Sequence, residues 1–176
     1  APNGAQACSL PDFFKFAGRM YELRNEGGDI GKHVESARTF VRDASRTRYP
    51  NTQTRIIHSP EGKDNIIHNY GTQRKTETEA DLIGDDGEIK EVLSLEASLT
   101  LTGKKPKEVA EIMSYLNDGT PAYIWRLNTK PKIRDERVVG LGADSGGFSL
   151  GCYKSPQLEL ASFGVSFSQK NNQENK

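Results

Sequence analysis

The chain has 176 residues, of which 24 are Lys or Arg and 24 are Asp or Glu, so its formal net charge at pH 7 is zero. This length is typical of one domain that buries its own core, and the balanced charge argues against a wholly disordered protein. No run of about 18 apolar residues occurs, so we predict no transmembrane helix. The charge is unevenly distributed, with a net −6 over residues 61–100 between two segments of net +3 each.

Two helices are predicted before residue 50. Ser9 is suited to cap the first helix, because Pro11 then stands in the first turn and Asp12 at the position of a capping acid. The second helix is predicted from about 29 to 45, where apolar residues form one stripe and three arginines, four residues apart, form another. These arginines are Arg38, Arg42 and Arg46.

A hairpin is predicted next, with strands at 52–58 and 65–70 that each contain the triplet Ile-Ile-His. We expect His58 to lie opposite Ile67, and the imidazoles of His58 and His68 to point to opposite faces or to meet only diagonally. A zinc site needs about four converging ligands, and no Cys or acid stands at a ligand spacing nearby. We therefore predict neither a metal nor a cofactor at these histidines.

The rest of the chain is mostly predicted to be strands. Alternating Thr and Glu within 72–83 suit the exposed edge of a sheet. From Leu93 to Thr102, Leu or Ala alternates with Ser, Glu or Thr, which predicts a strand with one buried face. Pro106 opens a helix predicted over about 106–117. The later predicted strands are 122–127, 137–141, 148–153 and 158–167.

These elements predict an α+β fold, with an N-terminal helical segment, a mostly antiparallel sheet packed with helices, and the 106–117 helix inserted between strands. We expect a single domain over 1–167 and a disordered polar tail over 168–176, which has no apolar residue. Only two cysteines occur, far apart in the chain, and no signal peptide is visible, which favours free thiols and a cytoplasmic location.

The turn sequence Asp-Ser-Gly-Gly at 144–147 resembles the nucleophile motif of chymotrypsin-like serine proteases. The resemblance implies Ser145 as nucleophile, His58 as base and an acid such as Asp81 to orient the base. The glycine that the family has two positions before the serine is Ala143 here, and predicted helices do not fit a double β-barrel. A hairpin turn rich in Gly, Asp and Ser accounts for the same residues. A serine hydrolase is therefore only an alternative to the leading prediction.

A second hydrolase alternative is a metal-dependent nuclease. Asp81 followed by Glu88-Ile89-Lys90 resembles the acid and Glu-x-Lys spacing of such enzymes. Their chemistry needs carboxylates that converge on a metal and a lysine near the attacking water. Glu88 comes directly after a tight turn, where a solvated side chain is expected, and three common residues match such a pattern often by chance.

The leading prediction is a non-enzymatic, self-associating structural or binding protein of the coat, matrix or scaffold type. The acidic centre between basic ends favours a homo-oligomer held partly by charge. Nucleic acid is a further predicted partner, through an arginine-rich helix beside which Tyr49 could stack. The predicted contact residues are Arg38, Arg42, Arg46, Arg48 and Arg55.

Overall fold

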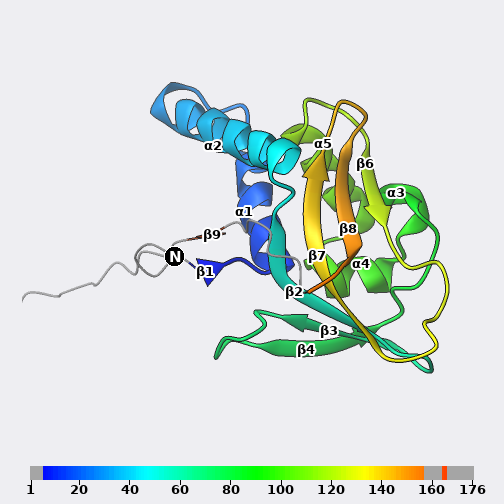
Figure 1. Ribbon diagram of the computed structural model, residues 1–176. Coiled ribbons are helices and arrows are strands. Elements are labelled where there is room, and N and C mark those ends of the chain that lie inside the picture. The colour runs from blue at the N-terminus through cyan, green and yellow to red at the C-terminus, as the bar shows by residue number, and fades with distance from the viewer. Residues whose placement is uncertain (1–5, 157–163, 166–176) are drawn as a thin grey trace, which may run out of the picture.

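The computed structural model describes residues 6–156 and 164–165 of the chain (Figure 1). Helices and strands alternate in groups along the sequence. Their bounds are β1 Gln6–Ala7, α1 Leu10–Glu22, α2 Gly28–Thr47, β2 Asn51–His58, β3 Asp64–His68, β4 Thr76–Ala80, β5 Gly87–Glu88, α3 Ile89–Val92, α4 Leu95–Thr102, α5 Pro106–Leu116, β6 Ala122–Trp125, β7 Asp135–Ala143, β8 Phe148–Lys154 and β9 Gly164–Val165.

The described strands form a seven-stranded sheet in the order β4-β3-β2-β7-β8-β6-β5 and a separate pair, β1 with β9. All the described pairings are antiparallel except that of β6 with β8. The predicted α+β class with N-terminal helices and a mostly antiparallel sheet is therefore confirmed. Helix α5 follows α3 and α4 in the chain, and the predicted insertion of a helix directly between strands is not confirmed.

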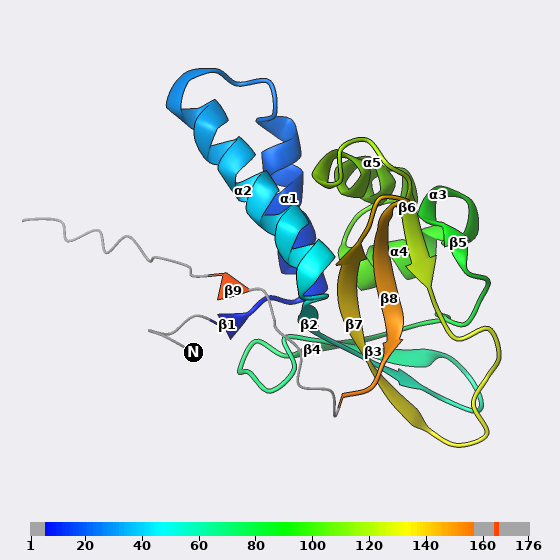
Figure 2. The same cartoon turned by 45° about the horizontal axis from the view of Figure 1, so that its top comes forward.

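The hydrophobic core lies between helices and one face of the sheet. Figures 1 and 2 show β7 and β8 lying over α4 and α5, with α1 and α2 beside them. Side chains from all four helices join one core cluster with alternate residues of β7 and β8, among them Leu141 and Leu150. The opposite face of β6, β7 and β8 has no helix packed against it in the described part of the chain.

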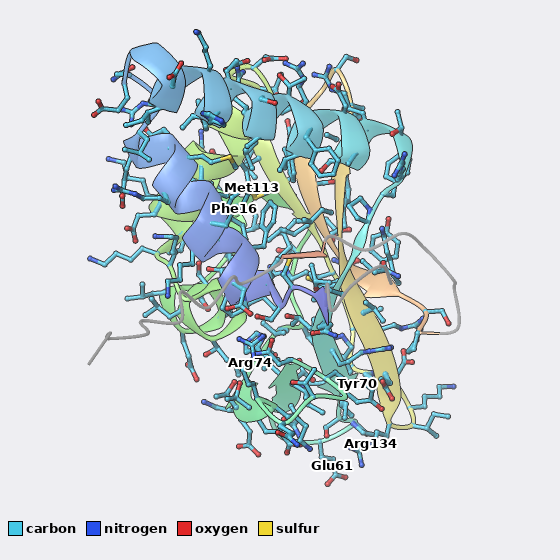
Figure 3. The ribbon with its side chains drawn as sticks, turned by 90° about the vertical axis from the view of Figure 1, so that its left-hand side faces the viewer. Phe16, Glu61, Tyr70, Arg74, Met113 and Arg134 are labelled. Atoms are coloured by element: carbon cyan, nitrogen blue, oxygen red, sulfur yellow. The ribbon has the colours of Figure 1, made fainter. Side chains whose placement is uncertain are left out.

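Helix α1 begins as the sequence predicts. The Ser9 hydroxyl accepts a hydrogen bond from the Asp12 backbone N–H at 3.3 Å and donates to the Asp12 carboxylate at 2.8 Å. This capping satisfies backbone donors that a helix start otherwise leaves without partners. Phe13 and Phe14 are buried with their rings edge to face, whereas Phe16 is 41% exposed on the outer side of α1 (Figure 3).

The predicted strand from Leu93 to Thr102 is wrong, because residues 95–102 form α4. Two caps explain the helix: Ser94 Oγ accepts the Ala97 N–H at 3.2 Å, and Gly103 ends the helix with φ +74°. Ala97 and Leu101, four residues apart, are buried, as a helix requires. The alternation in the sequence therefore does not reflect a period of two in the structure.

The predicted pairing of His58 with Ile67 is also wrong. Ile67 pairs with Arg55, a register three residues away from the predicted one. An odd shift moves side chains to the other face of a sheet, so His58 and His68 both point to the buried face rather than to opposite faces. Strand β3 begins at Asp64, whose buried carboxylate ties the end of the hairpin to other segments.

The predicted hairpin of β7 and β8 is confirmed. The predicted exposed edge of the sheet is also confirmed and is strand β4. Of the predicted strand 158–167, residues 164–165 form β9, and the others lie outside the described residues. The predicted tail at 168–176 also lies outside them, and the single-domain boundary stays a prediction. No helix in the described ranges is long and apolar enough to cross a membrane.

Candidate functional site

The residues of the predicted serine triad do not come together. Ser145 is exposed in the turn after β7, whereas His58 is fully buried and pairs with Asp135 at the other end of β7. A strand of nine residues spans about 25–30 Å, so the hydroxyl and the imidazole lie at opposite ends of the sheet. The Asp144 carboxylate instead accepts the N–H groups of Gly146 and Gly147 at 2.7 and 3.0 Å, which is turn chemistry.

The Glu-x-Lys pattern forms a local ion pair. Glu88 Oε2 lies 2.7 Å from Lys90 Nζ, and Asp81 Oδ1 lies 3.9 Å from Lys130 Nζ on another part of the surface. Within residues 6–156 and 164–165, no group of three His, Cys, Asp or Glu side chains is arranged to hold a metal ion. These side chains therefore do not assemble a nuclease-like centre.

The arginine stripe of α2 holds the end of α5. Arg38 Nε donates to the Tyr115 carbonyl at 2.8 Å, Arg42 Nη1 to the Asp118 carboxylate at 3.0 Å, and Arg46 Nη2 to Asn117 Oδ1 at 2.7 Å. Cations at the carboxyl end of a helix are favoured by its dipole. These three guanidinium groups are thus already engaged within the protein.

The other two predicted arginines differ from this group. Arg48 is exposed directly before Tyr49 at the end of α2. The Arg55 guanidinium lies 4.8 Å from the ring centroid of Tyr70, which Figure 3 labels, and 3.6 Å from the Glu136 carboxylate. Of the five predicted contact residues, Arg48 therefore remains the one best placed for an external ligand.

The buried histidines have separate structural environments. Nδ1 of His68 lies 3.0 Å from the Thr54 hydroxyl and Nε2 lies 2.8 Å from the Thr100 carbonyl, so both ring nitrogens have partners. Burial lowers the pKa of His68, which favours the neutral imidazole. His58 Nδ1 lies 3.2 Å from the buried Asp64 carboxylate, and Lys130 Nζ lies 3.2 Å from the other oxygen of Asp64.

The open face of the sheet carries four aromatic side chains, which we call the ring platform. Strand alternation places Tyr123, Trp125 and Tyr153 there, because their neighbours Ile124 and Cys152 point into the core on the other side. The Tyr123 and Trp125 rings are stacked at 26° with centroids 6.3 Å apart. The ring platform consists of Tyr49, Tyr123, Trp125 and Tyr153.

Glycines let three of these rings lie close to the backbone. An alanine methyl at Gly142 would lie 3.1 Å from the Tyr49 ring, and one at Gly151 would lie 3.2 Å from the Tyr153 ring. At Gly147 it would lie 2.7 Å from the Tyr123 ring, a separation that forces the ring to move. The rings thus rest on the sheet with their outer surfaces toward solvent, and Tyr49, Trp125 and Tyr153 are 49%, 43% and 49% exposed.

Tyr49 has an unusual backbone conformation. Its φ is +46°, in the left-handed region that a bulky residue rarely adopts. Lys154 supports it, because Lys154 Nζ donates to the Tyr49 carbonyl at 2.8 Å and lies 5.9 Å from the ring centroid. Backbone strain of this kind is concentrated at binding and catalytic sites. The geometry therefore marks the ring platform as the candidate site.

Sequence reasoning predicts Tyr49 as a stacking residue but does not predict the ring platform. The signal was present in the strands, where Tyr123 and Trp125 alternate with core residues, and where Gly140 and Gly142 do the same. What the sequence did not show was the register that sets β6 beside β8 and the turn that lays Tyr49 on Gly142.

Comparison with protein-family models, curated proteins and solved structures found no match to the chain.

Proposed function

We propose that this protein is a non-enzymatic binding protein that holds single-stranded nucleic acid on the ring platform. The observation that carries the proposal is Tyr49, held at φ +46° with its ring against Gly142 and its outer surface exposed. Rings fixed in this way lose little freedom when a flat ligand stacks on them. Every nucleobase offers such a flat surface, so stacking of this kind tolerates different sequences.

Cations beside the rings support a nucleic acid over a neutral sugar. Lys154 lies against Tyr49, and Arg48 is the residue that precedes Tyr49. Sites for single strands combine stacking rings with positive charge along the phosphate backbone. A neutral glycan would gain from the rings but has no charge for these cations to bind.

The main test removes rings one at a time. Trp125→Ala and Tyr49→Gly should each weaken binding of a single-stranded oligonucleotide about 5- to 150-fold, because stacking contributes about 1–3 kcal/mol per base. Trp125 is the only tryptophan in the chain, so quenching of its fluorescence reports binding at this surface in the wild-type protein. Fluorescence anisotropy of a labelled oligonucleotide measures the affinity of each variant.

Two controls separate binding from folding. Phe16→Ala removes a ring that is 41% exposed, close to the 43% of Trp125, but lies on α1 on the helical side of the sheet. It should leave the affinity unchanged. Tyr49→Gly should change the free energy of unfolding by less than about 1 kcal/mol, because glycine adopts positive φ without the penalty that tyrosine incurs. If wild type and all three variants bind the oligonucleotide with equal affinity, the proposal is refuted. If the protein binds glycans and no oligonucleotide, the ligand of the ring platform is a glycan instead.

Self-association is the second candidate, as the charge pattern of the sequence predicts. The observation that favours it is β4, an edge of the seven-stranded sheet whose residues Thr76–Glu79 are exposed. An exposed edge strand offers backbone groups to another chain. Light scattering should then show oligomers that dissociate as salt screens the attraction between acidic and basic segments. A monomer at every ionic strength and at high protein concentration contradicts this prediction.

A further inference from the structure

A groove of about 690 Å³ lies beside the start of β6, next to the ring platform. It is bounded by α5, by the start of β6, by the β5–α3 segment and by side chains of α1 and α2. Tyr21 and Tyr115 line it with their rings edge to face, 5.6 Å between centroids. The Arg24 and Arg38 guanidinium groups lie over these rings, 3.9 and 5.0 Å from their centroids, so the groove has aromatic walls that already carry cations.

The groove adjoins the ring platform, because Glu88, which lines the groove, is the β5 residue paired with Tyr123. Pro121 and Ala122 line the groove and directly precede Tyr123 in the chain. Lys90 also lines it, and Lys90 Nζ lies 2.7 Å from the Glu88 carboxylate. A chain of nucleotides that leaves the platform at Tyr123 would thus pass Lys90 and enter the groove.

The charges in the groove suit a phosphate backbone. Its three cations are Arg38, which is already bonded to Tyr115 and Asp118, and Lys90 and Lys107, which each lie beside one of its two acids, Glu88 and Glu111. Lys107 is the least constrained, because its side chain is 86% exposed and its nitrogen lies 3.9 Å from Glu111. An exposed pair of this geometry contributes little to stability, so its lysine can exchange the carboxylate for a phosphate.

We propose that this groove is a second subsite, which binds the part of a single-stranded nucleic acid that extends beyond the ring platform. The proposal rests on the proposed function of the platform. It assigns phosphate contacts to Lys90 and Lys107. A strand that occupies both subsites gains affinity from the linkage of the two, whereas a strand too short to reach the groove gains nothing from it.

The test compares two oligonucleotide lengths, about 4 and about 12 nucleotides, within the range of known single-strand sites. The double variant Lys90→Ala/Lys107→Ala should weaken binding of the longer strand about three- to tenfold and leave the shorter strand unaffected. Lys32→Ala is the matched control, since Lys32 is a similarly exposed lysine (80%) in a loose pair with Asp29. Trp125→Ala should weaken both lengths.

Each outcome bears on one of the two proposals. If the double variant binds both lengths as wild type does, or weakens both equally, the groove is no second subsite and the platform proposal stands. If Trp125→Ala has no effect on either length while the double variant weakens the longer strand, the platform proposal fails and the groove itself is the binding site. If neither oligonucleotide binds the wild-type protein, both proposals fail.

Discussion

Replacing Asp64 with alanine should lower the free energy of unfolding by about 3–5 kcal/mol, the range for removing one partner of a buried ion pair. The Asp64 side chain has no solvent exposure. Its oxygens accept hydrogen bonds from the Leu82 N–H at 2.9 Å and from Lys130 Nζ at 3.2 Å, and lie 3.2 Å from His58 Nδ1. Alanine leaves the buried Leu82 N–H and the buried His58 ring without this acceptor, whereas Lys130 keeps its hydrogen bond to the Gly62 carbonyl at 2.9 Å. Urea unfolding at neutral pH measures the difference.

The same carboxylate should make stability depend on pH. Burial alone would raise the pKa of Asp64, but its contacts with His58, Leu82 and Lys130 lower it to about 2. An unfolded Asp has a pKa of about 3.9, so the stabilisation is fully present above pH 4 and is lost as the pH falls toward 2. The loss amounts to about 2–3 kcal/mol.

Asp64→Asn is the matched control for both measurements. Asparagine keeps the size of the side chain and one acceptor oxygen, so it should destabilise the protein less than alanine does. Both variants should lack the part of the loss between pH 4 and pH 2 that Asp64 contributes, because neither replacement side chain titrates there, whereas the lowered pKa values of Glu77 and Asp118 are unchanged. A wild-type profile that is flat across this range, or an alanine variant within about 1 kcal/mol of wild type, would show that the buried cluster contributes little.

Local signals in the sequence predicted most elements but not their partners. The Ser9 cap and the hairpin of β7 and β8 depend on residues close in the chain, and both predictions are confirmed. The predicted strand at 93–102 is wrong because the caps at Ser94 and Gly103, which the prediction did not consider, decide the structure. Hydrophobic pattern alone does not separate a short helix from a strand.

The predicted register of β2 and β3 is wrong for a nonlocal reason. Asp64 begins β3 because its carboxylate binds Leu82 and Lys130, and nothing near residue 64 in the sequence announces those partners. The arginine stripe was found correctly, but its partners at 115–118 come from another helix. The ring platform likewise joins Tyr49 to β6 and β8 only through the tertiary fold.

Arg126 should be the second residue whose loss strongly destabilises the protein. Its guanidinium is largely buried beside the platform residue Trp125 and donates to two backbone carbonyls, Asp85 at 2.7 Å and Val92 at 3.0 Å. Gly84 permits this position, since an alanine methyl there would lie 2.5 Å from Arg126 Nη2. These contacts tie the end of β6 to the loop that precedes β5 and to the end of α3.

Arg126→Met should therefore lower the free energy of unfolding by about 3 kcal/mol, because methionine fills part of the space but leaves two carbonyl acceptors without donors. Arg126→Lys restores the charge and donors but not the planar fork, so it should recover only part of the loss. Urea unfolding followed by Trp125 fluorescence measures both effects beside the ring platform. If Arg126→Met unfolds with the same midpoint as wild type, water replaces the guanidinium at those carbonyls and the arginine does not anchor β6.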